Sequence, residues 1–155
     1  MDVKYINPFL TATINVIKTM AFLDPKPGKP FIKKESKALG DVSGVIGLSG
    51  DLKGSLSITF EEDTIKHIVS NMFGEDINEI NDEVRDAVGE LTNMISGDAR
   101  RQLQSFGVKI DAAIPSIITG KNHTITHIAK GPIVALPFDT EKGKFIVEFT
   151  MEKTK

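Results

Sequence analysis

Residues 81–107, NDEVRDAVGELTNMISGDARRQLQSFG, form the longest stretch of helical periodicity in the chain. Apolar residues recur there at intervals of three and four, which places them on one face of a helix. These residues are Val84, Val88, Leu91 and Ile95. Asn81 is a suitable N-cap, Arg100 and Arg101 complement the helix dipole near the other end, and Gly107 ends the segment. We therefore predict a long helix that packs one face on a core.

A second face of this helix carries a polar stripe with the same spacing. Its members are Asp86, Glu90, Asn93 and Gly97. Glu90 and Asn93 are three residues apart, so their side chains project side by side. A carboxylate can hold a cation or a lysine, an amide can orient a water, and a glycine lets another backbone approach closely. The stripe therefore suits positioning better than acid–base or nucleophilic chemistry.

The spacing alone leaves other interpretations open. Most polar stripes on amphipathic helices are solvated faces, and Glu-x-x-Asn recurs at Glu75 and Asn78 in a predicted loop. An unrelated hydrolase could use Asp86 and Glu90 as acid and base. Those two residues lie one turn apart, however, and would need a facing cleft that the sequence does not reveal.

The segments around this helix predict an α+β domain. A first helix is expected from Asn7 as N-cap, with Pro8 in its first position, until the prolines at 25, 27 and 30 give a loop. Residues 44–49 and 55–60 predict a β-hairpin with one buried face, and residues 61–73 a short helix capped by Gly74. Further strands are expected at 108–112, 116–119, 124–128, 133–138 and 144–151. We predict one domain over residues 1–155, with a mixed or antiparallel sheet packed against three helices.

Composition excludes several classes of function. The 155 residues are 40% hydrophobic and 26% charged, with a net charge of −2, so no basic surface for nucleic acid is expected. The chain has no cysteine, which excludes disulfides and thiolate chemistry. No signal peptide and no apolar run of about 20 residues is present, so we expect a cytoplasmic protein that does not span a membrane.

Two other groups of residues were weighed as sites. His67, His123 and His127 do not predict a metal site, because His123 and His127 fall on a predicted strand, where their spacing makes a poor chelate. Lys33 and Lys34 are interpreted as a solvated edge rather than an anion site.

The full string Asp86-x-x-x-Glu90-x-x-Asn93-x-x-x-Gly97, after a hairpin and a short helix, resembles the signature of the CheC/CheX chemotaxis phosphatases. Three short strings indicate the CheX branch: Asn-Pro-Phe at 7–9, Leu-Ser-Gly at 48–50 and Phe-Gly at 73–74. CheC-type relatives carry two motif copies. The first predicted helix here has no Glu-x-x-Asn, so one site per chain is expected.

The resemblance implies a CheC-like fold and a protein aspartyl-phosphate phosphatase that acts on a phosphorylated CheY-like receiver. Glu90 would pair with the receiver's active-site lysine, and Asn93 would hold the attacking water in line. Asp86 and Gly97 would support docking. The Mg²⁺ belongs to the receiver, so the chain needs no cofactor or metal of its own. A homodimer that pairs through its sheets is also implied.

A binding module without catalysis is the alternative from another class. Such a module would dock a response regulator or a flagellar-switch component with the same fold. The presence of both Glu90 and Asn93 favours the phosphatase, because a non-catalytic copy would be free to lose either residue.

Overall fold

The computed structural model describes residues 3–34, 38–121, 123 and 132–154. Within these ranges the chain forms three helices and eight strands. The helices are α1 (Val3–Ala21), α2 (Glu62–Phe73) and α3 (Asp82–Gln104). The strands are β1 (Lys26–Pro27), β2 (Phe31–Lys33), β3 (Val42–Gly50), β4 (Leu52–Phe60), β5 (Ile110–Ala112), β6 (Ser116–Thr119), β7 (Ile133–Thr140) and β8 (Gly143–Lys153).

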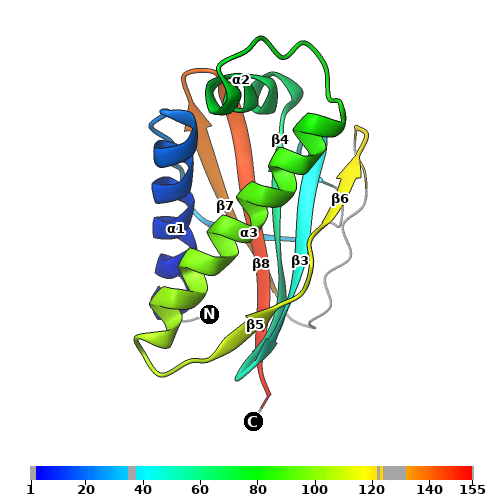
Figure 1. The fold of residues 1–155 in the computed structure, drawn as a ribbon. Helices are drawn as coiled ribbons and strands as arrows, with labels where there is room; N and C mark the ends of the chain where they lie inside the picture. Colours follow the sequence, from blue (N-terminus) through cyan, green and yellow to red (C-terminus); the bar gives the residue numbers. More distant parts are fainter. Residues whose placement is uncertain (1–2, 35–37, 122, 124–131, 155) are drawn as a thin grey trace.

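The strands form one sheet in the order β1-β7-β8-β4-β3-β5, with β2 also paired to β7 and β6 to β3. Every pairing among these strands is antiparallel. Helices α1 and α3 lie across one face of the sheet, and α2 lies at one end (Figure 1). The predicted α+β class is confirmed. The sheet edges are β1 with β2 and β5 with β6; a homodimer through either edge stays a prediction.

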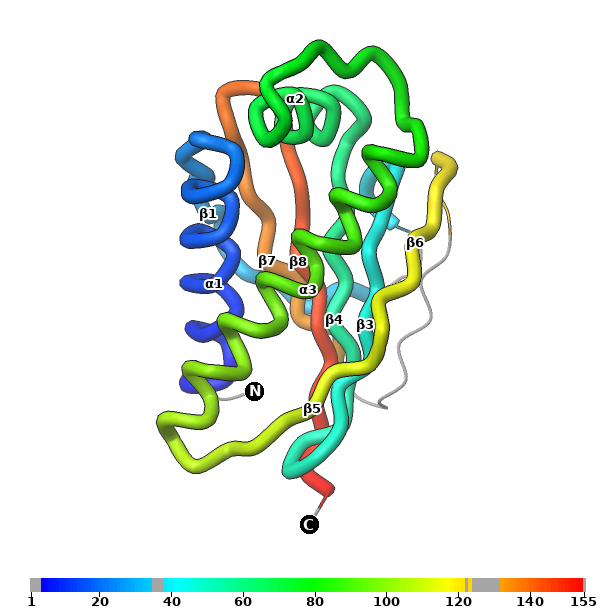
Figure 2. Tube along the Cα trace, viewed as in Figure 1, coloured from blue at the N-terminus to red at the C-terminus, as the bar shows by residue number. Residues whose placement is uncertain are grey.

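Helix α3 crosses the sheet obliquely, from the β6 side at its start to the first turns of α1 at its end (Figure 2). Its predicted apolar face is confirmed, because Val84, Val88, Leu91 and Ile95 are all fully buried. The predicted cap is also present: Asn81 Oδ1 accepts a hydrogen bond of 2.9 Å from the Val84 amide. The position and rotation of α3 are therefore fixed by its buried side.

The hairpin of β3 and β4 and the short helix α2 lie where the sequence predicts them. Gly74 ends α2 with φ of 68°, and its amide donates to the Ser70 carbonyl at 2.8 Å. This left-handed conformation is one that glycine adopts without a steric penalty.

The predicted start of the first helix is wrong. Helix α1 begins at Val3 rather than after Asn7, and Pro8 lies inside it. Tyr5 and Ile6 pack against the core, so apolar burial extends the helix upstream of the proline.

The predicted loop at the prolines is also wrong in part. Strands β1 and β2 pair with β7 there, and Pro27 lies opposite Phe138. Proline has no amide hydrogen to donate to a neighbouring strand. An edge strand tolerates it, because one side of its backbone bonds to no other strand. The strand predicted at 124–128, and His127 within it, lie outside the described residues.

The hairpin buries both faces, not one as predicted. Ser43, Ser55, Ser57 and Thr59 point away from the helices and are at most 1% exposed. Segments distant in sequence supply contacts to this second face: His123 Nε2 lies 2.6 Å from Ser43 Oγ. Burial of this face depends on the tertiary fold, which the local alternation of residues cannot reveal.

Lys33 is not part of a solvated edge. Its Nζ lies 2.9 Å and 3.1 Å from the two carboxylate oxygens of Glu148 on β8. The two side chains are 6% and 0% exposed, so this is a buried ion pair. Strand β2 carries Lys33 onto the sheet through its pairing with β7, a contact that a basic dipeptide in sequence does not predict.

No helix in the described ranges is both long enough and apolar enough to cross a bilayer.

The close approach of α3 to β3 gives the first prediction. A Cβ on Gly44 would overlap the Thr92 side chain, so Gly44→Ala should lower the free energy of unfolding by about 1–3 kcal/mol in urea denaturation. Gly89→Ala is the matched control. Its Cβ would lie 3.6 Å from Ile117, an ordinary contact, so that variant should be as stable as wild type or more so. Equal stability of wild type and Gly44→Ala would show that the two elements are not packed this closely.

The buried ion pair gives the second prediction. Lys33→Met removes the ammonium group that lies against the buried Glu148 carboxylate and should cost about 3–5 kcal/mol of stability. The double variant Lys33→Met, Glu148→Met removes both charges and should recover much of that loss. Thermal and urea unfolding of the three proteins measures the difference, and an unchanged Lys33→Met variant would contradict a buried pair.

Candidate functional site

The polar stripe of α3 lies on the exposed side of the helix. Asp86, Glu90 and Asn93 are exposed and Gly97 is half-buried. In the described part of the chain, Glu90 and Asn93 form no hydrogen bond or ion pair with another side chain or with distant backbone. A carboxylate and an amide therefore stand side by side with their polar atoms available to another molecule.

Contacts on the buried side of α3 fix the position of the stripe. Thr92, between Glu90 and Asn93, is fully buried; its hydroxyl donates to the Val88 carbonyl at 2.7 Å, and its side chain lies against Gly44 of β3. Thr92 therefore packs in the core. Because these contacts fix the helix backbone, the side chains on its outer face project from a rigid support.

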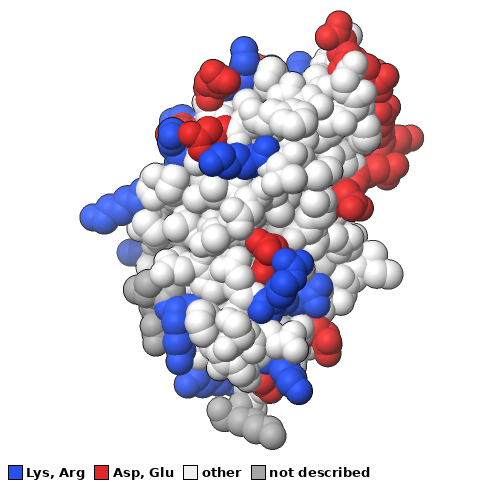
Figure 3. Space-filling model, turned by 60° about the vertical axis from the view of Figure 1, so that its left-hand side comes forward, with Lys and Arg blue, Asp and Glu red and all other residues white. Residues whose placement is uncertain are grey.

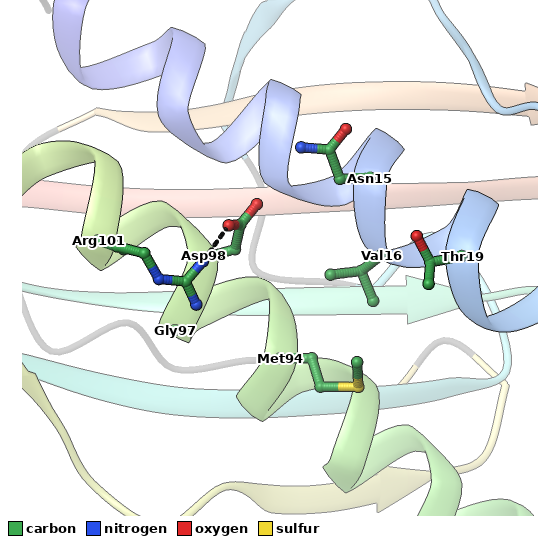
Figure 4. Close-up of a pocket in the computed structure, with 7 residues that line it drawn as sticks. All are labelled: Asn15, Val16, Thr19, Met94, Gly97, Asp98 and Arg101. Atoms are coloured by element: carbon green, nitrogen blue, oxygen red, sulfur yellow. Dashed lines mark hydrogen bonds and ion pairs between the residues drawn. The ribbon is translucent and has the colours of Figure 1, made fainter.

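A hollow of about 320 Å³ lies between α3 and α1, beside the stripe (Figure 4). Its walls are formed by Asn15, Val16, Thr19, Met94, Gly97, Asp98 and Arg101. Asp98 and Arg101 form an ion pair of 2.7 Å within it. Gly97 also lines a second hollow on the other side of α3, so the absence of a side chain there opens the helix surface on both flanks.

Charge is divided along α3. Its first half carries Asp82, Glu83, Asp86 and Glu90 with one arginine, Arg85, and its last turns carry Arg100 and Arg101 with one aspartate, Asp98. In Figure 3, acidic side chains are densest along the upper right edge of the surface, whereas basic side chains are spread over its left side, its middle and its lower part. Glu83 is hydrogen-bonded to Glu75, and this contact raises the pKa of Glu83 above its ordinary value. Asn93 stands where the acidic half gives way to the basic one.

The described residues contain no group of three or more His, Asp or Glu side chains that could hold a metal ion. His123 is engaged with Ser43 and with the Gly120 carbonyl, at 2.6 Å in each case. That the chain needs no metal or cofactor of its own stays a prediction.

Comparison with known proteins shows the family to which the chain belongs. The sequence model of the family described as "Chemotaxis phosphatase CheX" matches residues 42–139, which include the hairpin, α2 and the whole of α3. The chain belongs to the CheX family. The matched residues include the helix that carries the stripe.

Relatives of this CheX chain include proteins from three bacteria. The CheY-P phosphatase CheX of Thermotoga maritima is 29% identical over 138 residues, 88% of each chain. The crystal structure of chemotaxis protein CheX from Vibrio vulnificus is 48% identical, covers 96% of this chain and 99% of its own, and superposes with a TM-score of 0.90. The CheX of the CheX-CheY-BeF3-Mg²⁺ complex from Borrelia burgdorferi is 27% identical, with coverage of 96% and 98% and a TM-score of 0.81.

Two parts of this CheX surface were missed in the sequence. Asn15 and Thr19 of α1 face the stripe, but their place depends on how α1 packs against α3, which no local pattern predicts. Arg100 follows Gly97 by three residues and so continues the stripe by one turn. This spacing is a local signal in the sequence, and it gives Arg100 a place on the stripe in addition to its favourable position near the end of the helix dipole.

The geometry at Gly97 gives the third prediction. A Cβ there would meet only Arg100 Nη2, at 3.9 Å, so nothing in the fold requires a glycine. Gly97→Ala should therefore raise the free energy of unfolding by about 0.5–1 kcal/mol, because alanine is the better helix former. Thermal unfolding beside wild type measures this. A fall in stability would show that the surface at Gly97 is more crowded than described.

Proposed function

We propose that this protein hydrolyses the aspartyl phosphate of a CheY-like response regulator and that it acts through the exposed stripe of α3. The observation that carries the proposal is the pair Glu90 and Asn93, side by side on a rigid helix and without partners inside the described chain. Membership of the CheX family supports it. So do the name of the Thermotoga maritima relative, a CheY-P phosphatase, and the complex of the Borrelia burgdorferi relative with CheY.

Glu90 is assigned the anchoring role. Its carboxylate would pair with the active-site lysine of the receiver and so fix how the receiver lies on α3. The carboxylate stands on the acidic half of the helix, where Asp86 one turn earlier adds to the negative potential that a lysine would meet. Asp86 is therefore assigned a supporting role in docking.

Asn93 is assigned the positioning of the attacking water. An amide can accept a hydrogen bond from the water and so hold its oxygen in line with the bond that breaks. Hydrolysis of an acyl phosphate needs mostly positioning and charge stabilisation, with little covalent help from the protein. Because the amide is neutral, it adds no negative charge beside the phosphoryl group. The Mg²⁺ that balances the phosphoryl charge would come with the receiver.

Gly97 is assigned a role in close approach. The half-buried backbone at this position lies one turn beyond Asn93 and borders a hollow on each side. The receiver surface could therefore approach α3 closely enough for the Asn93 amide to reach the phosphoryl group.

The fourth prediction separates the two roles and tests the proposal. Phosphoryl loss from a Mg²⁺-loaded, phosphorylated receiver of the same organism is followed with and without the protein. Wild type should speed the decay. Asn93→Ala should lower kcat on the order of 100-fold or more while it still binds, because it removes an interaction made in the transition state. Glu90→Ala should act chiefly by raising KM, because it removes a docking contact.

Asn78→Ala is the matched control, since Asn78 ends the second Glu-x-x-Asn of the chain and lies exposed in the loop before α3. It should keep wild-type activity. Full activity in Asn93→Ala would exclude the water-positioning role. Wild type that binds the receiver without speeding its decay would favour the alternative, a docking module without catalysis.

A further inference from the structure

The stripe of α3 continues beyond the residues that the proposed function uses. Arg100 lies three residues after Gly97, and Gln104 lies four residues after Arg100. Both therefore lie on the same face of the helix as Glu90 and Asn93. The Arg100 Nε donates to the Ser96 hydroxyl at 3.3 Å, and Ser96 is fully buried. One guanidinium nitrogen lies 3.9 Å from the position that a Cβ on Gly97 would take. The guanidinium therefore rests beside Gly97, on the Asn93 side of its own Cα.

Arg100 faces the second hollow, which has a volume of about 460 Å³. Its lining residues are Gly97, Arg100, Arg101, Gln104, Lys109, Ile110 and Asp111. Arg101 is already paired with Asp98, and Asp111 contributes one carboxylate. Across the ranges the structure describes, neither Arg100 nor Lys109 forms an ion pair. The hollow therefore presents two cationic groups, Arg100 and Lys109, whose N–H donors can bind an acidic group.

We propose that this hollow receives an acidic side chain of the docked receiver, with Arg100 as its principal contact and Lys109 as a second one. The inference rests on the proposed function, because the hollow shares Gly97 with the stripe. It adds a cationic contact at the end of the site opposite Glu90. A receiver would then be bound at both ends of the stripe. Its lysine would pair with Glu90, and one of its acidic side chains would pair with Arg100.

The position of Arg100 favours an acidic side chain over the phosphoryl group as its partner. Gly97 lies four residues from Asn93, about 6 Å along the helix axis. The bond to Ser96 holds the guanidinium at Gly97, so it stands about one turn from the point where Asn93 would meet the phosphoryl group. A guanidinium that is already held in place loses little side-chain entropy when it binds a carboxylate, and its fork matches carboxylate geometry.

The test measures binding and turnover separately. Binding is measured with the receiver loaded with Mg²⁺ and beryllium fluoride, which mimics an acyl phosphate, and turnover by phosphoryl loss from the phosphorylated receiver. Arg100→Glu should raise Kd and KM about 10-fold or more at low salt and leave kcat within about two-fold. The difference from wild type should shrink as salt is added. Lys109→Glu should have a smaller effect of the same kind, and Arg100→Lys should retain most of the affinity.

Lys142→Glu is the matched control, since Lys142 is exposed in the turn between β7 and β8 and undergoes the same change of charge. It should bind and turn over as wild type does. Thermal unfolding of each variant verifies that the fold is retained.

Unchanged Kd and KM for a folded Arg100→Glu would overturn the inference. So would a fall in kcat with KM unchanged, because Arg100 would then act on the phosphoryl group. If wild type binds but does not speed decay, the proposed function fails alone, and the Kd of Arg100→Glu still decides this inference. If wild type does not bind the loaded receiver, both fail.

Discussion

The structure depends on the contact between α3 and β3. The apolar face of α3 is fully buried, and Gly44 lets Thr92 lie where a side chain on the strand would stand. A helix that packs this closely on an antiparallel sheet cannot rotate or slide without steric overlap or lost burial. The opposite face of α3 is therefore directed outward in one orientation. The arrangement of the stripe follows from packing on the other side of the helix.

The outer face of α3 brings several different functional groups together on successive turns of one helix. Along about four turns it presents the carboxylates of Asp86 and Glu90, the exposed amide of Asn93, the glycine at position 97 and the Arg100 guanidinium, which is hydrogen-bonded to Ser96. None of these groups is a strong nucleophile. In the proposed function, such a surface would orient another protein and a water molecule, while the reacting bond and its metal would belong to the partner.

The far side of the sheet shows a second kind of constraint. Lys33 and Glu148 form a buried ion pair among buried serines and threonines, so this face is polar although solvent does not reach it. The buried hydroxyl of Ser57 has no hydrogen-bond partner among the residues that the structure describes. Polar contacts need specific geometry, whereas apolar packing tolerates small shifts. The face therefore favours one register between β2, β7 and β8, even where the strands are short and contain proline.

Strong local signals in the sequence were enough to predict α3 with its Asn81 cap and buried face, the β3–β4 hairpin, α2 with Gly74, and the stripe from Asp86 to Gly97. These follow from periodicity and capping, which depend on residues a few positions apart. Tertiary structure alone decided the start of α1, the proline-containing edge strands, the burial of Lys33 and the hollows beside Gly97. Each of these depends on contacts between residues that are distant in sequence, and the free energy of burying such contacts outweighs local preference.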